Sequence, residues 1–315
     1  MTISDCLPRF QEHLRVVLGF RDGTIKRYCY TLTRFEKWIA SRGVEGGTDT
    51  ISQADIEDWL KDLFYNQGNM KNSSRASKLA AIKKFFAFLA YDGAIDKNED
   101  PAVRIPSPKV AKVMPQKFST AQLKAIFTAP DLTSPMGIRD LAILTVLYGC
   151  GPRVEEIREM VIDDLRFTGN DIYIYIQGKG AKERTVRLRR RASSNLRNWL
   201  FIREQYAAPG ERALFVSFRP PQVGSNLSKV SYNNILKKYA AAVGIKNERV
   251  FVHKVRATFA TDLYDADHGL IEISMLLGHS SVETTQGYIV ISDKVLKKTA
   301  ISDKRWKELE EREDV

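Results

Sequence analysis

Residues 100–115 read Asp100-Pro-Ala-Val-Arg-Ile-Pro-Ser-Pro-Lys-Val-Ala-Lys-Val-Met-Pro115, with four prolines in sixteen residues. Proline lacks an amide donor and disfavours helix in the residue before it. The stretch therefore predicts an extended, basic connector between two domains. We place the domains at residues 1–99 and 118–292, the linker at residues 100–117 and a helical tail at residues 293–315.

The residues before the linker predict a four-helix domain. Helical patterns cover residues 4–18 and 22–41, a segment that starts with a capping box at Ser52 and ends near Gly68, and residues 73–91. An apolar stripe in the fourth helix leaves its basic residues on other faces. A solvated surface and a face presented to DNA phosphates are equally open interpretations of these basic residues. The candidate DNA contacts on this helix are Arg75, Lys78, Lys83 and Lys84.

The residues after the linker predict a mixed domain. Helices are expected from Ser119 or Thr120 to Phe127, over residues 136–149 and from Arg153 to Met160. Two short alternating segments, 171–176 and 183–188, predict a β-hairpin. Helices return after residue 190, so the expected fold class is mainly α with a small antiparallel sheet in the second domain.

Composition narrows the function classes. The 315 residues include 49 Lys+Arg and 38 Asp+Glu, a net charge of +11. Counted along the sequence, residues 1–117 carry +5 (19 − 14), residues 118–292 carry +6 (23 − 17) and the remainder carries zero (7 − 7). Two basic segments favour a protein that grips a polyanion, foremost nucleic acid, from two sides.

Other classes find no support in the sequence. The longest apolar stretch, residues 141–150, is half of what a membrane span needs, and the N-terminus lacks the pattern of a signal peptide. Three cysteines without metal spacing argue against a disulfide or zinc framework and for a reducing cytoplasm. We therefore expect a cytoplasmic protein with no membrane contact.

Four local clusters carry residues suited to phosphate chemistry. Each alone has an ordinary explanation, such as a surface arginine, a plain hairpin turn or a packed tyrosine. Together they supply arginines that donate paired hydrogen bonds to a phosphate, histidines that transfer protons, a turn lysine and a tyrosine hydroxyl. The clusters are Tyr148-Gly-Cys-Gly-Pro-Arg153-Val-Glu-Glu156, Gly178-Lys179-Gly-Ala-Lys182-Glu-Arg184, Val252-His253-Lys-Val-Arg256 and Leu276-Leu-Gly-His279 with Tyr288 nine residues later.

In this order and spacing the clusters resemble the tyrosine recombinase (phage integrase) family of site-specific DNA recombinases, Xer-like in size. The resemblance covers nearly the whole chain. It implies a two-domain, C-shaped clamp, with a SAM-like core-binding domain and a catalytic domain. Three positions depart from the family's usual pattern, Pro152, Ala257 and Val290, but none of them replaces an expected catalytic residue.

The resemblance also implies a role for each candidate residue. Tyr288 resembles the nucleophile, Arg153 and Arg256 the phosphate-binding pair, and Lys179 the general acid. His253 and His279 resemble the remaining phosphate- and proton-handling groups, and Glu156 the acidic residue that orients the first arginine. Lys182 and Arg184, in the hairpin, are further candidate DNA contacts.

The implied reaction is phosphoryl transfer to tyrosine, giving a 3′-phosphotyrosyl intermediate and a Holliday junction. No metal site, cofactor or ATP is expected. The expected partners are a double-stranded recombination site and a homotetramer, or a heterotetramer with a second recombinase, on two DNA sites. The tail residues expected to dock on a neighbouring protomer are Leu296, Ile301, Trp306 and Leu309.

Several alternatives stay open at this point. The biological role is either that of an integrase or transposase of a mobile element, or that of a Xer-like resolvase. A non-catalytic DNA-binding protein of the same fold and a type IB topoisomerase-like relaxing enzyme are the competing functions. The complete set from Arg153 to Tyr288 argues against the first of these, and the predicted core-binding domain and tail argue against the second.

Overall fold

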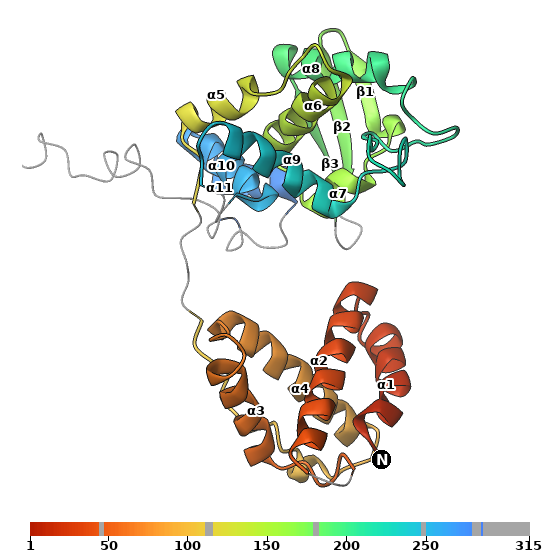
Figure 1. Cartoon of the computed structure of the whole chain (residues 1–315), viewed down its shortest axis with the longest axis vertical. Helices are drawn as coiled ribbons and strands as arrows, with labels where there is room; N and C mark the ends of the chain where they lie inside the picture. The colour runs from red at the N-terminus through yellow and green to blue at the C-terminus, as the bar shows by residue number, and fades with distance from the viewer. Residues whose placement is uncertain (44–46, 111–115, 179–182, 247–249, 279–284, 286–315) are drawn as a thin grey trace, which may run out of the picture. The chain divides into compact units, whose positions relative to one another are not determined.

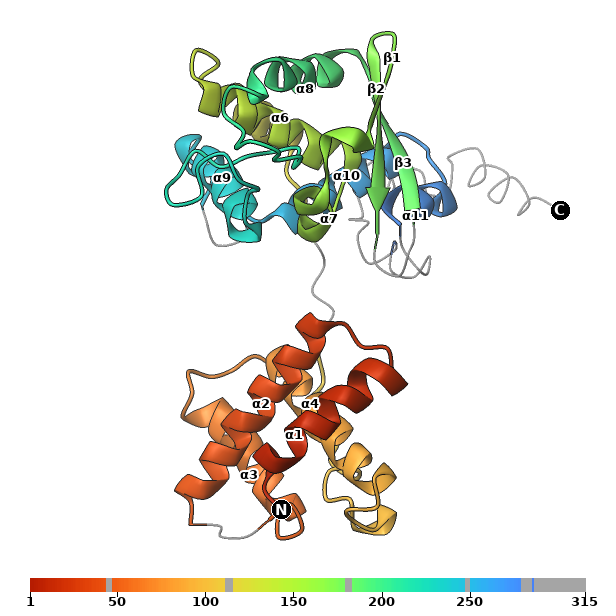
Figure 2. The ribbon, with the colours of Figure 1, turned by 90° about the vertical axis from the view of Figure 1, so that its right-hand side faces the viewer.

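The computed structural model of the chain describes residues 1–43, 47–110, 116–178, 183–246, 250–278 and 285. The chain divides into two compact units, Met1–Lys112 and Val113–Val315 (Figures 1 and 2). Each unit has a hydrophobic core of its own. Among the described helices, none has the length and apolar content needed to cross a membrane.

The first unit is helical, as the sequence predicts. Its helices are α1 (Ile3–Glu12), α2 (Asp22–Ser41), α3 (Gln53–Tyr65) and α4 (Asn72–Tyr91), with a π-helical turn η1 (His13–Val17) after α1 and a short 3-10 turn η2 (Lys97–Glu99). The predicted capping box at Ser52 and Asp55 starts α3. Phe10 and Phe85 meet edge to face in the core, with their ring centroids 5.4 Å apart.

The start of the predicted linker is folded rather than extended. Residues 101–104 form a turn, and Ala102 and Ile105 are buried in the core of the first unit. At the other end, Lys117 pairs with Asp265 at 2.9 Å, and the Phe118 amide donates to Thr258. The prolines were a correct signal for a break in regular structure. Apolar side chains among them nevertheless add to the core of the first unit, which shortens the connector.

The second unit combines helices with a three-stranded antiparallel sheet. Its helices are α5 (Thr120–Thr128), α6 (Pro135–Cys150), α7 (Val154–Glu159), α8 (Arg190–Arg203), α9 (Lys229–Ala242), α10 (Val252–Asp265) and α11 (Leu270–Leu277), with a 3-10 turn η3 (Ile162–Asp164) before the sheet. The strands β1 (Leu165–Thr168), β2 (Asp171–Gln177) and β3 (Glu183–Leu188) pair in sequence order. In Figure 2, α6 and α8 lie along one side of this sheet.

Strand β1 is not apparent from the sequence. Three of its four residues are exposed, so it lacks the alternation of buried and exposed residues seen in β2 and β3. Its pairing with β2, in which Leu165 lies opposite Ile174, holds it as an edge strand. The predicted hairpin of β2 and β3 is confirmed, with Ile174 opposite Val186.

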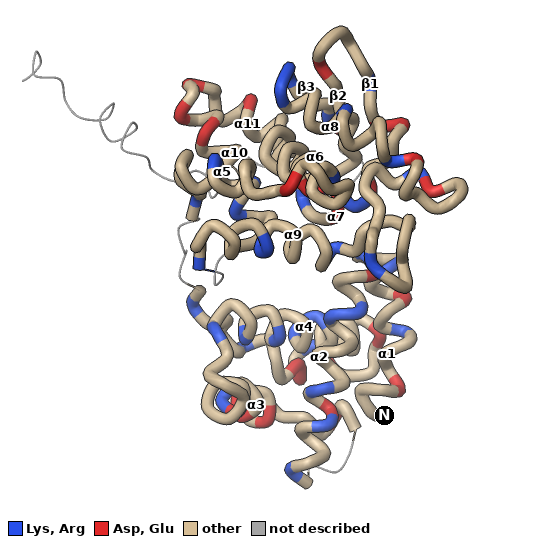
Figure 3. The backbone as a smooth tube through the Cα atoms, turned by 45° about the horizontal axis from the view of Figure 1, so that its top comes forward, with Lys and Arg blue, Asp and Glu red and all other residues tan. Residues whose placement is uncertain are grey.

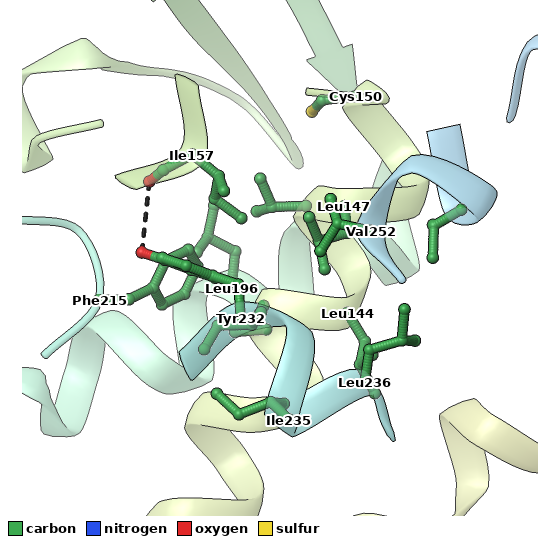
Figure 4. Packing of buried hydrophobic residues seen from close by; sticks show 14 of the residues in the cluster. Leu144, Leu147, Cys150, Ile157, Leu196, Phe215, Tyr232, Ile235, Leu236 and Val252 are labelled. Carbon is green, nitrogen blue, oxygen red and sulfur yellow. Dashed lines mark hydrogen bonds between the residues drawn. The ribbon is translucent and has the colours of Figure 1, made fainter. Parts of the chain in front are cut away.

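Helix α6 is the centre of the second core. Leu144 and Leu147 from α6 pack with Leu236 and Tyr232 from α9 (Figure 4). The buried Tyr232 hydroxyl donates to the Ile157 carbonyl of α7 at 3.4 Å. This packing fixes α7, and with it the residues that precede α7, against the body of the unit.

Candidate active site

Two helices end at glycines that bring the candidate residues together. Gly151 ends α6 and Gly278 ends α11, both in the left-handed region, with φ of 54° and 63°. Glycine adopts this conformation without the steric cost that a side chain brings. A Cβ on Gly151 would lie 2.4 Å from Phe259, so this turn also has no room for a side chain.

Arg153 follows the first glycine turn and forms the N-cap of α7. Its backbone amide donates to one carboxylate oxygen of Glu156 at 2.9 Å, and its guanidinium donates to the other at 2.6 Å. A further bond of 3.4 Å reaches the Gly278 carbonyl. Because the side chain is still 30% exposed, its remaining donors are accessible to a ligand.

Arg256 lies below this surface on α10 and is fully buried. Its two terminal nitrogens donate to the backbone carbonyls of Gly151 and Leu277, at 2.5 and 2.6 Å. Glu156 lies 3.8 Å away. One planar guanidinium thus joins the ends of α6 and α11, whose carbonyls carry the negative partial charge of a helix C-terminus.

Glu156 is the common partner of the arginine cluster, and Arg184 is its third member. The Arg184 guanidinium donates to Glu156 at 2.7 Å, and both side chains are nearly inaccessible to solvent. Burial by itself would raise the pKa of Glu156, but the hydrogen bond and charge of Arg184, together with the hydrogen bonds from Arg153, lower it to about 2. The carboxylate is therefore ionised at neutral pH.

The position of Arg184 differs from our expectation of a DNA contact. The side chain lies on the buried face of β3, in line with Val186 and Leu188, and only 6% of its surface is exposed. The alternation of buried and exposed residues along the strand was the signal that sequence reasoning had available and did not apply to this residue.

His253 and Arg256 share α10, as their spacing predicts. His253 lies in the first turn, and it lines a hollow on the surface together with Pro152 and Arg153. Although solvent still reaches the residue, desolvation of the ring, followed by the positive charges of Arg256 and Arg153, lowers the pKa of His253. A lower pKa favours the neutral imidazole, which accepts a proton.

The other candidates fall into two groups. Lys179, Lys182, His279, Tyr288 and the tail residues Leu296, Ile301, Trp306 and Leu309 lie outside the described residues. Arg75, Lys78, Lys83 and Lys84 lie on α4, along which Lys and Arg recur (Figure 3), and all four are partly exposed. Arg75 stacks over the Phe64 ring at 4.7 Å, and burial together with the charge of Arg34 lowers the pKa of Lys78.

No group of three or more His, Cys, Asp or Glu side chains in the described ranges is placed to hold a metal ion.

Comparison with known proteins identifies the family. The family model described as "Phage integrase family" matches residues 116–294, and that of the "Phage integrase, N-terminal SAM-like domain" matches residues 7–93. The chain belongs to the phage integrase family of tyrosine recombinases. It is therefore an enzyme of site-specific DNA strand cleavage and rejoining, and the family, the mainly helical fold class and this activity are confirmed.

Relatives of this recombinase cover most of its length. It is 30% identical over 282 residues to tyrosine recombinase XerD of Vibrio cholerae, which covers 89% of each chain. It is 34% identical over 290 residues to tyrosine recombinase XerC of Herpetosiphon aurantiacus, covering 91% of this chain and 90% of that one.

Solved structures share the fold. The XerH recombinase in a post-cleavage complex with a palindromic difH substrate gives a TM-score of 0.71 at 21% identity, covering 87% of this chain and 78% of that one. A lambda integrase dimer bound to a core site gives 0.67 at 19% identity, covering 90% and 97%.

The low pKa of Glu156 gives a pH-dependent contribution to stability. A carboxylate whose folded-state pKa is depressed stabilises the fold above its unfolded pKa, and this stabilisation is lost as the pH falls through the folded pKa. The pKa of Glu156 falls from about 4.5 in the unfolded chain to about 2 in the folded protein, which corresponds to at most about 3 kcal/mol in the free energy of unfolding. We expect the stability difference between the wild type and Glu156→Gln to shrink as the pH falls from about 6 to about 3.

Chemical unfolding at several pH values measures this difference. Glu159→Gln, a change at an exposed glutamate of the same helix, is the matched control, and its difference is expected to stay within about 0.5 kcal/mol throughout. If the stabilities of the two variants changed equally with pH, the lowered pKa of Glu156 would be contradicted.

Proposed function

We propose that this recombinase cuts one strand of its site with the hydroxyl of Tyr288, forming a 3′-phosphotyrosyl link and releasing a 5′-hydroxyl. The observation that carries the proposal is the convergence of Arg153, Arg256 and Glu156 beside the end of α11, the helix that precedes His279 and Tyr288 in the chain. Arginines held in this way offer a preorganised, positively charged site for the phosphate.

The phosphate binds to the donors of Arg153 and near the charge of Arg256. A phosphodiester carries one negative charge, and attack by a phenolate adds a second in the transition state. Fixed guanidinium groups stabilise this charge without reorganising during the reaction. The hydrogen bonds of both arginines to backbone carbonyls or to Glu156 supply that fixed orientation.

Proton transfer needs a base for the tyrosine and an acid for the leaving oxygen. His253, kept neutral by its lowered pKa, accepts the proton of the Tyr288 hydroxyl. Lys179 donates a proton to the departing 5′-oxygen, and His279 assists at the phosphate. The last two assignments and that of Tyr288 rest on the family motifs that these residues match.

The proposed assembly is a tetramer on two double-stranded sites. Relatives of the same fold include a lambda integrase tetramer bound to a Holliday junction. The basic residues of α4 and Lys182 supply phosphate contacts. We place the reaction in the cytoplasm, where free thiols such as those of the three cysteines stay reduced.

The biological role proposed first is resolution of replicon dimers. It is favoured by the match to XerC and XerD relatives at 30% identity or more over about nine tenths of both chains. Integration or transposition of a mobile element is the second candidate, because the fold also matches the integrase of transposon Tn1549.

The test is the formation of covalent protein–DNA adducts. Purified protein is mixed with nicked duplexes from its own genetic neighbourhood, in EDTA and without ATP, and adducts that resist SDS are resolved on a gel. The wild type is expected to form adducts, and Tyr288→Phe is expected to form none, because its ring lacks the attacking oxygen. Mapping the cleaved position then gives the site, and its location in a replicon or at an element's end separates the two roles.

Two outcomes would contradict the proposal. Adducts that survive Tyr288→Phe would show that another residue is the nucleophile. Specific DNA binding by the wild type without any adduct, even on nicked substrates, would contradict the proposed cleavage by this chain.

A further inference from the structure

We infer that Arg184 is a positioning residue for cleavage, which neutralises Glu156 so that the charges of Arg153 and Arg256 remain available to the phosphate. The inference rests on the proposed function and adds to it a residue that the candidate catalytic set does not contain.

The first support is the geometry around Glu156. Arg153 occupies one carboxylate oxygen with its side chain and the other with its backbone amide. Arg184 donates to this second oxygen at 2.7 Å, whereas Arg256 stays 3.8 Å from it. Arg184 is therefore the closest cation to the oxygen that faces Arg256.

The second support is a charge count over the cluster. Three arginines and one glutamate give 3 − 1 = +2, which matches the two negative charges of the transition state. Without Arg184 the cluster holds 2 − 1 = +1, and Glu156 offsets part of the positive charge that Arg153 and Arg256 present to the phosphate. Because Arg184, Arg256 and Glu156 are buried, one unit of charge among them has a large effect on the transition state.

The third support is the burial of Arg184 next to the end of α11. A Cβ built on Gly278 would lie 2.9 Å from one of its terminal nitrogens, so the guanidinium packs directly against the residue before His279. Its Nε and Nη1 atoms are buried and form no hydrogen bond within the described part of the chain. A side chain with 6% exposure does not reach a DNA backbone from this position, which argues against a direct contact.

The experiment compares full-length variants on one nicked substrate. Arg184→Met removes the charge, Arg184→Lys keeps it, and Arg187→Met is the matched control, because Arg187 lies on the same strand but is exposed and paired with Asp171. Adduct rates are measured in single turnover, DNA affinity is measured over a range of salt concentrations, and thermal unfolding reports folding. Formation of the adduct by the wild type on the same gel tests the proposed function. The ratio of the variant's adduct rate to that of the wild type tests the positioning role of Arg184.

We expect Arg184→Met to reduce the adduct rate by about 100-fold while its DNA affinity and salt dependence stay near those of the wild type. Arg184→Lys is expected to retain part of the rate, and Arg187→Met all of it. The double variant Glu156→Gln/Arg184→Met restores the count to +2 and is expected to react faster than Arg184→Met alone. A purely structural role for Arg184 would restore the adduct rate only in step with the melting temperature, which the thermal unfolding measures.

Three results would overturn the inference. An unchanged adduct rate in Arg184→Met would show that the charge is not needed. A loss of affinity with a salt slope smaller by about one would indicate a lost phosphate contact instead. A double variant no faster than the single variant would assign the defect to structure. If Arg184→Met does not fold, the same comparison is made between Arg184→Gln and Glu156→Gln/Arg184→Gln, which carry the same charges as the methionine pair.

Discussion

Replacing Arg256 with lysine is expected to lower the adduct rate by about 10²- to 10³-fold. The guanidinium joins the Gly151 and Leu277 carbonyls with two nitrogens of one rigid plane. An ammonium group keeps the charge, but as a single point it does not reproduce both bonds, so neither the ends of the two helices nor the charge near the phosphate is held in the same place. Single-turnover cleavage of a nicked duplex at saturating protein measures the loss.

Arg203 provides a matched control for the disruption of the fold. It is also almost fully buried, and it also donates to backbone carbonyls, those of Ala213 and Glu211. Arg203→Lys is expected to lower the melting temperature but to leave the adduct rate of the folded protein near that of the wild type. Equal rate losses in Arg203→Lys and Arg256→Lys would contradict a specific role for Arg256.

The largest expected effect on stability comes from Asp140, on α6. This carboxylate is 1% exposed, pairs with the buried Arg139 at 2.6 Å and accepts from the Tyr239 hydroxyl at 2.8 Å. Asp140→Ala leaves the guanidinium of Arg139 buried without its counter-charge. Such a change costs about 3–5 kcal/mol in the free energy of unfolding. Urea unfolding, followed by the fluorescence of the buried Trp199 in the same unit, measures the change.

Two further variants test whether the unpaired charge of Arg139 causes the loss of stability. Asp163→Asn breaks an exposed pair with Arg212 in the same unit and is expected to cost at most about 1 kcal/mol. Arg139→Met/Asp140→Leu removes both charges and is expected to cost less than Asp140→Ala alone, because no unpaired ion remains. A double variant that is the least stable of the three would show that the pair itself, rather than the unpaired charge, determines the effect.

The sequence was most informative where periodicity and motif coincide. Spacing alone predicts the helices of the first unit, the hairpin of β2 and β3 and the placement of His253 and Arg256 on one helix. Edge strand β1 was not predicted because pairing with β2, rather than an alternating pattern, holds it. Ala102 and Ile105 were placed in an extended linker because the prolines around them do not reveal which core their apolar neighbours join.

The site was predicted less completely. Local motifs place Arg153 and Glu156 on one short helix, but they do not reveal that Glu156 also binds Arg184 from the hairpin. The sequence also does not reveal the backbone acceptors of Arg256, because they depend on where α6 and α11 end in space. The pairing of Arg139 with Asp140 was not predicted from the sequence, and a further partner of Asp140, Tyr239, comes from α9.

The acceptors of Arg256 also determine which sequence changes this site tolerates. Both are main-chain oxygens, so exchanging the leucine at position 277 for another apolar side chain leaves the acceptor in place. The position that tolerates no such exchange is Gly151, where any side chain would contact Phe259. Over many generations, the backbone turn rather than the acceptor's own side chain is the feature that selection must preserve around the buried arginine.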